Sequence, residues 1–194
     1  MRSFLIALAM GGAVSVGPLS AQTPLRPFTI GISGGATFVT GEDRDFYNTG
    51  YNAQGSIGIP LPGLSMALRI DAMYHKIPGQ NRSTQTVAGA PDTLFIGDLS
   101  LLGFTANAQF YTGSPTSLVR PYVIAGAGPY RIENKGVLYG QNVSASATKM
   151  GVTGGIGVTV NALATRLFAE ARVHNVFADG GSARVYPLTV GFFF

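Results

Sequence analysis

Two histidines and a group of charged side chains are the residues of this 194-residue chain that could carry chemistry. The charged group is Arg69, Asp71, Lys149, Arg166, Glu170 and Arg172. Several of them are two residues apart, which in a β-strand places their side chains on the same face. Opposite charges that share a dry interior must pair, because an isolated buried charge is costly. We therefore predict a structural network of salt bridges and hydrogen bonds, with an ion- or proton-selective path as the alternative.

The histidines, His75 and His174, do not complete a catalytic or metal-binding pattern. A histidine can activate a serine within hydrogen-bond reach, but His174 is followed by Asn175 and Val176, without the serine that a lipid deacylase pattern places two residues on. Neither histidine is accompanied by a carboxylate cluster that would complete a metal site. The acidic segment 42–45 lacks the spacing of a calcium loop. We expect no catalytic residue, no metal and no cofactor, and therefore not an enzyme.

The elements that would position these side chains are β-strands, because the chain alternates with a period of two from Phe28 onward. In residues 64–77, Leu68 and Ile70 lie on an apolar face, and Arg69 and Asp71 lie on the other. The same alternation predicts eight strands, at about 28–38, 50–59, 64–77, 95–111, 119–132, 148–160, 164–177 and 184–194. The phase breaks at 97–102, where we expect a bulge or the end of a strand.

The predicted connections alternate between short and long. Short ones fall at 60–63, 112–117 and 161–163, whereas longer and more polar ones fall at 41–48, 78–93, 133–146 and 178–183. Tight turns on one side and long loops on the other are typical of membrane β-barrels. With an even number of strands, both termini are expected on the periplasmic side, next to the short turns.

Aromatic residues form two predicted bands on the apolar face. Phe28, Phe110, Phe192 and Phe194 fall near the short turns, and Phe38, Tyr74, Phe95, Phe177 and Tyr186 fall near the long loops. Such bands are typical of the two membrane interfaces. Charged residues make up only 11% of the chain, against about 25% in a globular domain, which is too few to cover a soluble surface. The predicted fold is all-β, an eight-stranded antiparallel up-and-down transmembrane β-barrel.

The N-terminus has the pattern of an export signal. One arginine precedes a short apolar stretch that ends in small residues, so residues 1–21 are predicted to be a cleavable signal peptide and residues 22–194 the barrel domain. The chain has no cysteine, which excludes disulfides and thiolate chemistry. Its net charge of +4 is spread along the sequence without a basic run, so nucleic-acid binding is not expected.

The segment from Arg120 to Gly128, RPYVIAGAG, and the terminal Phe194 carry a resemblance to a known family. They are similar to a glycine-rich strand and the C-terminal assembly signal of the small eight-stranded outer-membrane barrels, the OmpA-like and OmpX-like β-barrel domains. The resemblance implies a monomer in the outer membrane of a Gram-negative bacterium, in contact with lipid and lipopolysaccharide. It also implies recognition by the barrel-assembly machinery through the C-terminal strand.

The function expected from this combination is a structural or surface-interaction role in the cell envelope. Envelope integrity, adhesion or resistance would act through the outer loops 78–93 and 133–146, with the lumen plugged by side chains. One alternative is a porin-like pore for small solutes or ions. A second is a soluble, lipocalin-like ligand-binding barrel, which would have the same alternation with the apolar face inside.

Overall fold

The computed structural model describes residues 28–40, 47–61, 63–79, 85–87, 90–92, 97–114, 116–138, 141–162, 165–178 and 181–194. The predicted signal peptide, the acidic segment 42–45 and Phe95 lie outside the described residues. Within the described part of the chain, no helix has the length and apolar character needed to cross a membrane.

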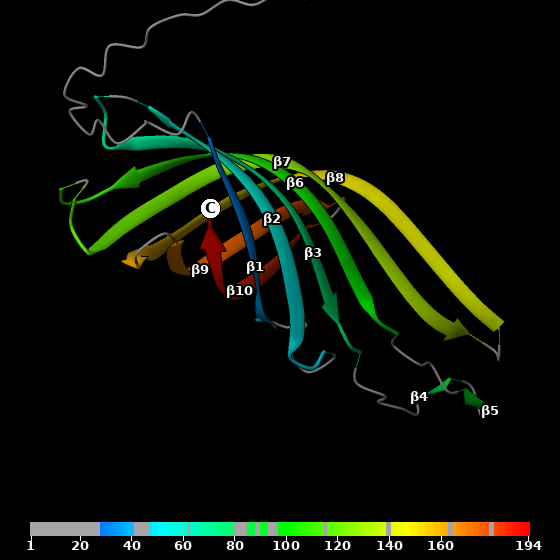
Figure 1. Cartoon of the computed structure of the whole chain (residues 1–194). Helices are drawn as coiled ribbons and strands as arrows, with labels where there is room; N and C mark the ends of the chain where they lie inside the picture. Colours follow the sequence, from blue (N-terminus) through cyan, green and yellow to red (C-terminus); the bar gives the residue numbers. More distant parts are fainter. Residues whose placement is uncertain are drawn as a thin grey trace, which may run out of the picture.

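Eight long antiparallel strands close into a barrel (Figure 1). They are β1 (Thr29–Val39), β2 (Gly50–Leu61), β3 (Met66–Ile77), β6 (Leu99–Tyr111), β7 (Val119–Leu138), β8 (Gln141–Ala162), β9 (Thr165–Ala178) and β10 (Gly181–Phe193). Each pairs with its neighbours in this order, and β10 pairs with β1. Two short strands, β4 (Gln85–Val87) and β5 (Ala90–Asp92), form a separate hairpin. The predicted all-β, eight-stranded up-and-down barrel is confirmed.

The last residues of the chain close the barrel. The Phe194 amide donates to the Ile30 carbonyl at 2.8 Å, and the Ile30 amide donates back to Phe194 at 3.3 Å. Further along the same ladder, Phe192 lies opposite Ile32. Because every long strand has two hydrogen-bonded neighbours, the wall of the barrel has no open edge along this seam.

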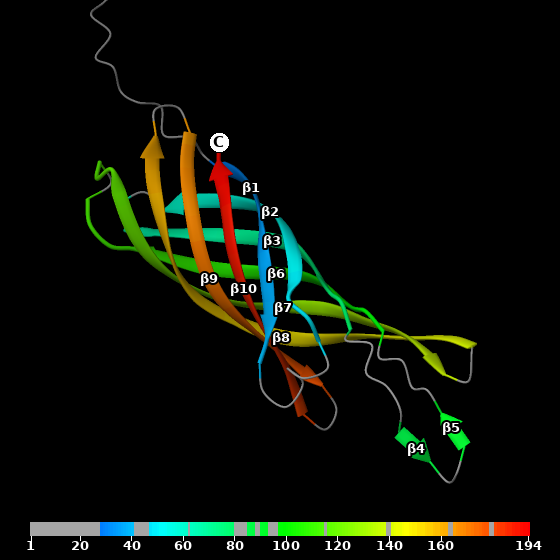
Figure 2. The same cartoon turned by 90° about the horizontal axis from the view of Figure 1, so that it is seen from below.

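The connections define two ends of the molecule. Strands β2, β6 and β8 finish at the end of the barrel that also holds the C-terminus, here called the short-turn end (Figure 2). Gly63 and Gly113 have φ values of 78° and 81° there, in the left-handed region that favours glycine. Strands β4 and β5, the last residues of β7 and the first residues of β8 lie at the opposite end, here called the loop end.

The predicted loop at 133–146 is wrong for most of its length. β7 continues to Leu138 and β8 begins at Gln141, and the ladder between them is unbroken to the tip. Small and polar residues such as Ser144 and Ala145 gave this segment no apolar alternation, but backbone pairing between two strands does not require it. The predicted loop at 178–183 is likewise shorter, because β9 ends at Ala178 and β10 begins at Gly181.

The break in alternation at 97–102 marks a strand end and not a bulge. β6 begins at Leu99 and keeps one register with β7 from Leu99–Asn134 to Tyr111–Tyr122. Leu101 faces inward and is 3% exposed, whereas Leu102 faces outward. Two adjacent leucines on opposite faces therefore produced the apparent change of phase.

The two faces of the barrel wall have opposite chemical character. Outward residues are large and apolar, and Ile70 and Val190 remain 56% and 62% exposed in the isolated chain. Inward residues are mostly polar, and Arg69 and Glu170 are 1% and 2% exposed. A soluble lipocalin-type barrel requires the reverse arrangement, with its apolar side chains inside.

Glycines make room for four inward aromatic rings. Each ring lies directly opposite a glycine on the neighbouring strand: Tyr122 opposite Gly157, Tyr130 opposite Gly103, Phe168 opposite Gly191 and Phe193 opposite Gly31. A Cβ atom at any of these glycines would overlap the ring that faces it. The high glycine content of the chain, 27 residues, therefore helps to fit aromatic side chains into a narrow lumen.

Candidate functional site

Four charged side chains meet inside the barrel and are called here the charge network: Arg69 and Asp71 from β3, and Glu170 and Arg172 from β9. These strands are four places apart around the barrel in either direction, so the contacts cross the whole lumen. Arg69 Nη2 lies 3.0 Å from Glu170 Oε1, and Arg172 Nη2 lies 2.8 Å from Asp71 Oδ2. Within each strand, Arg69 also pairs with Asp71 and Arg172 with Glu170.

Neutral side chains add hydrogen bonds to this network. The Tyr122 hydroxyl donates to Glu170 Oε2 at 2.7 Å, and Asn107 Nδ2 donates to Asp71 Oδ2 at 3.0 Å. Below Arg69, the rings of Phe168 and Phe193 stack with centroids 4.5 Å apart, and the guanidinium lies 5.8 Å from each centroid. Two cations and two anions balance one another, which is the condition for keeping charges in a buried site.

A second polar layer lies nearer the loop end. The rings of His75 and His174 are 5.5 Å apart. His75 Nδ1 is hydrogen-bonded to Thr37 Oγ1 at 2.9 Å, and His174 Nδ1 to the Tyr130 hydroxyl at 2.8 Å. Among the described residues, no group of three histidine, cysteine or acidic side chains is placed to hold a metal ion.

An apolar cluster, here called the apolar cap, lies beside the histidines and extends from them towards the loop end. It consists of Met73, Ile77, Leu101, Tyr130, Val176 and Val185, all almost fully buried. The alternation pattern did not indicate this cap, because apolar residues at inward positions break the polar character of that face. Together with the two polar layers, the cap places almost fully buried side chains along the lumen.

The short-turn end of the lumen is lined by what we call the rim cluster: Tyr111, Arg120 and Arg166. The Arg120 guanidinium lies 4.5 Å from the centroid of the Tyr111 ring, and both arginines interact electrostatically with Tyr111. Arg120 Nε is buried without a hydrogen-bond partner among the described residues. In that part of the chain, neither arginine forms an ion pair.

The six charged residues predicted from the sequence are therefore divided between several places. Arg69, Asp71, Glu170 and Arg172 come together in the charge network. Arg166 belongs to the rim cluster, and half-buried Lys149 lies opposite Tyr130 in the β7–β8 ladder. No sequence pattern indicated Tyr122 or Asn107, because a neutral polar residue at an inward position is ordinary in any barrel.

The predicted aromatic bands all project from the outer wall. Exposed fractions run from 39% for Tyr74 to 52% for Phe194, and Tyr186 is half-buried beside Phe38 on the neighbouring strand. Phe28, Phe110, Phe192 and Phe194 lie near the short-turn end, and Phe38, Tyr74, Phe177 and Tyr186 towards the loop end. Tyr51, 54% exposed at the start of β2, joins the second band and was not predicted.

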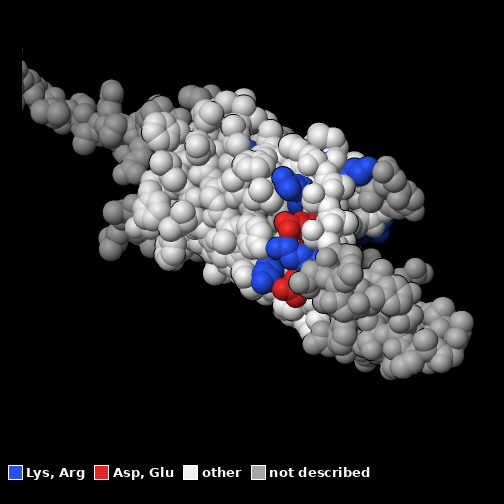
Figure 3. Space-filling view, turned by 90° about the vertical axis from the view of Figure 1, so that its right-hand side faces the viewer, with Lys and Arg blue, Asp and Glu red and all other residues white. Residues whose placement is uncertain are grey.

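Outward charges are confined to the loop end. Every outward Lys, Arg, Asp or Glu of the described strands lies there: Lys76, Arg131, Glu133, Lys135 and Arg184. Figure 3 shows blue and red side chains gathered towards this end beside a white flank. Lys76 Nζ lies 3.2 Å from Asp98, and this hydrogen-bonded ion pair raises the pKa of Lys76.

Comparison with known proteins identifies the fold. No protein-family model and no curated protein matches the chain in sequence. The solved structure of Neisserial surface protein A matches it with a TM-score of 0.60, at 16% identity over 86% of this chain and 96% of that protein. In fold, the chain resembles the small eight-stranded outer-membrane barrels. The solved structure of a major outer membrane protein from Thermus thermophilus also matches the chain. Its TM-score is 0.59, at 12% identity over 86% of this chain and 98% of that protein.

Proposed function

We propose that this chain is an outer-membrane β-barrel protein with a structural or surface-interaction role in the cell envelope. The observation that carries the proposal is the outer wall, which is apolar from the short turns up to the loop end and has aromatic side chains near both ends. Water would make such a surface prone to association, whereas hydrocarbon accommodates it. Its long strands have 11 to 22 residues, enough for the roughly 9–11 that a tilted strand needs to cross the bilayer core.

The loop end would then face the outside and the short-turn end the periplasm, as in other barrels of this type. The charged residues at the loop end and the protruding β7–β8 hairpin are the surfaces available to partners outside the cell. We propose that envelope integrity, adhesion or resistance acts through these surfaces. Lipopolysaccharide would contact the outer wall near the loop end.

We also propose that the lumen does not conduct. The charge network spans it from β3 to β9, and the almost fully buried apolar cap lies beside the histidines and extends towards the loop end. Both features oppose the alternative of a pore for solutes or ions. A catalytic role is not proposed, because His174 is buried inside the barrel and bonded to Tyr130, away from the lipid-facing surface.

Assembly is proposed to use the C-terminal strand, with a monomeric product. β10 ends in Phe192 and Phe194 on the outward face and closes against β1. A signal peptide at residues 1–21 would deliver the chain to the periplasm for this step.

Fractionation and gel mobility test the location and the fold together. The protein should be recovered with outer membranes, and in detergent the unboiled barrel should migrate differently from the boiled chain. Recovery in the detergent-free soluble fraction would refute the membrane proposal. Purified protein in planar bilayers should give no large, stable conductance steps, and such steps would refute the closed lumen and favour a pore.

A further inference from the structure

The mouth of the lumen at the short-turn end brings two arginines to one tyrosine. Arg120 faces inward, because Tyr122, two residues further along β7, is 2% exposed. Arg166 faces inward for the same reason, with Phe168 on β9 at 3% exposure. The Arg120 guanidinium lies 4.5 Å from the centroid of the Tyr111 ring, and Arg166 interacts electrostatically with both residues. The three side chains of the rim cluster therefore converge inside the barrel wall.

Hydrogen bonds to the intervening strand hold this arrangement at the backbone. Thr159 Oγ1 donates to the Arg120 carbonyl at 3.2 Å, and Asn161 Nδ2 donates to the Ser117 carbonyl at 2.9 Å, just before β7 begins. Arg166 lies opposite Asn161 in the β8–β9 ladder. The two arginines therefore extend from the strands on either side of β8, and side chains of β8 fix the start of β7 between them.

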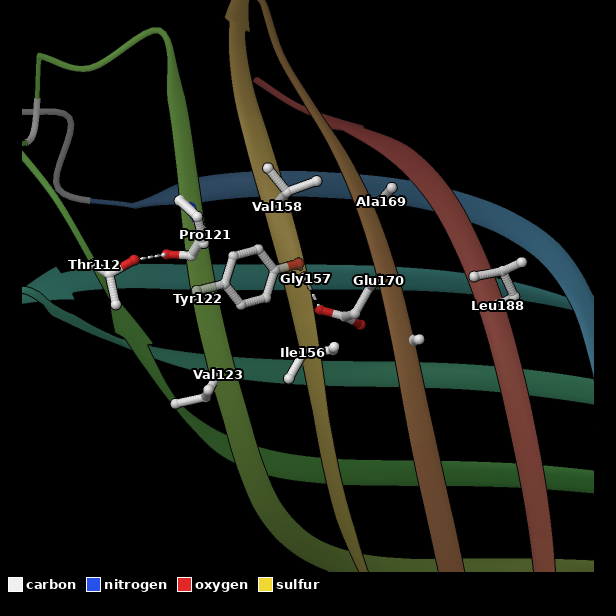
Figure 4. A pocket seen from close by; sticks show the side chains of 11 residues that line it. Thr112, Pro121, Tyr122, Val123, Ile156, Gly157, Val158, Ala169, Glu170 and Leu188 are labelled. Atoms are coloured by element: carbon white, nitrogen blue, oxygen red, sulfur yellow. Dashed lines mark hydrogen bonds between the residues drawn. The ribbon is translucent and has the colours of Figure 1, made fainter.

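Aromatic side chains separate the rim cluster from the charge network. The next inward residue after each rim arginine is aromatic: Tyr122 on β7 and Phe168 on β9. Figure 4 shows the Tyr122 ring and its hydrogen bond to Glu170. Phe168 stacks on Phe193, and both rings lie below Arg69. A ligand at the rim cluster would therefore meet its two arginines and not the balanced charges behind the aromatic rings.

The positive charge of the rim cluster is not balanced nearby. Among the described residues neither arginine forms an ion pair, the two repel each other, and Arg120 Nε is buried without a hydrogen-bond acceptor. The segments that join strands at this end, 60–65, 112–118 and 161–165, contain no Asp or Glu in the sequence. A buried donor without an acceptor and two like charges directed to one place are both costly, and an anion between them relieves both costs.

We infer that the rim cluster binds one phosphate group carrying two negative charges, either free phosphate or a phosphate monoester. Guanidinium groups match phosphate oxygens through paired, charge-assisted hydrogen bonds, and stacking on Tyr111 leaves the edge of the Arg120 guanidinium free to donate. Two cations balance a dianion, whereas chloride or a phosphate diester offers one charge. The ligand stops at the mouth, because the aromatic rings and the charge network lie behind it. Its entry from the periplasm rests on the orientation proposed above.

The test uses protein refolded in nonionic detergent and shown to be folded by its gel mobility before and after boiling. Calorimetric titration at low ionic strength measures the binding of inorganic phosphate, methyl phosphate and dimethyl phosphate. We expect saturable one-to-one binding of inorganic phosphate or methyl phosphate, and the tighter of the two identifies the source. Dimethyl phosphate, which has one charge, should bind at least tenfold more weakly, and equal binding of all three would overturn the inference.

Variants assign the binding to the rim arginines. Arg120→Gln combined with Arg166→Gln should weaken phosphate binding by roughly tenfold to hundredfold, because the charged donors are lost. Replacing both by lysine keeps the charges without the paired donors and should retain more binding than the glutamine variant. The matched control is Arg131→Gln combined with Arg184→Gln, which removes the same net charge from exposed positions at the loop end. If this control weakens binding as much as the rim variant does, the inference is wrong.

Two further outcomes separate this inference from the proposed function. A folded barrel that is recovered with outer membranes but shows no saturable phosphate binding overturns the inference and leaves the proposed function standing. Vesicles loaded with phosphate should retain it when they contain the barrel, and release would overturn the statement that the ligand stops at the mouth. Recovery in the detergent-free soluble fraction would refute the proposed function, while phosphate binding could still be measured on that protein.

Discussion

Replacing Asp71 by asparagine should destabilise the barrel by about 3–5 kcal/mol, the usual cost of removing one partner from a buried ion pair. The Asp71 carboxylate accepts hydrogen bonds from Arg69 Nε at 2.9 Å and Asn107 Nδ2 at 3.0 Å. It also forms an ion pair with Arg172, whose Nη2 lies 2.8 Å away. Asparagine keeps the size of the side chain but leaves two buried guanidinium groups with Glu170 as their only anion in the charge network. A cost of this size lowers the folding equilibrium constant by roughly a hundredfold to several thousandfold.

The assay is urea unfolding of the barrel in short-chain phospholipid vesicles, followed by gel mobility and circular dichroism. Asp98→Asn is the matched control, because it breaks the Lys76–Asp98 pair, whose side chains are 38% and 43% exposed, and should cost less than about 1 kcal/mol. Adding Arg172→Gln to Asp71→Asn should cost less than the sum of the single changes, by about 1–3 kcal/mol, because it removes one uncompensated cation. If Asp71→Asn costs no more than Asp98→Asn, the charge network does not stabilise the barrel as argued.

Three further substitutions, measured in the same unfolding assay, test the packing inside the lumen and the difference between the inward and outward faces of the barrel wall. Gly157→Leu should lower the free energy of unfolding by about 1–3 kcal/mol, because the new side chain overlaps the Tyr122 ring. Gly154→Leu is the control and should be tolerated, because the atom nearest to the added Cβ is 4.0 Å away. Equal losses of stability in the two variants would contradict this reasoning. Ile70→Arg places a cation on the outward face of β3 and should cost about 2–4 kcal/mol in a bilayer, and a neutral result would argue against lipid contact there. Tyr122→Phe removes the hydroxyl that donates to Glu170 at 2.7 Å and should cost about 1–3 kcal/mol; a neutral result would mean that another group satisfies that oxygen.

The fold was predictable from the sequence because the two faces of each strand meet different surroundings. Residues such as Arg69 and Ile70 follow each other along the chain, and their chemical difference fixes which one lies inside. Strand order then follows from chain neighbours pairing in turn. Prediction failed where the two faces were not chemically different, as in residues 141–147, mostly small or polar, that extend β8 beyond the predicted start at 148.

The candidate site was less predictable because its contacts join residues that are distant in sequence. The inward position of Glu170 implies that it has a cationic partner. Arg69, 101 residues away in the sequence, could be identified as that partner only from the structure, because the barrel places β3 opposite β9. The pairing of Tyr122 with Gly157 depends on the β7–β8 register, which alternation alone leaves open. The apolar cap was missed since its leucine and valine residues contradict a uniformly polar interior.

The shape of the barrel is determined mainly from inside. In a bilayer, outward residues such as Ile70 meet lipid whether or not the strands are in their correct positions, so they add little to the choice between registers. The polar contacts across the lumen do discriminate, because an unpaired buried charge is costly and a shift of one residue would move Arg69 to the lipid face. The same reasoning applies to the arginines of the rim cluster, which form no ion pair among the described residues. Arg120 and Arg166 are only half-buried at the end of the lumen, where water can hydrate a cation, so the barrel need not supply them with a carboxylate as it must for the charges that cross the interior.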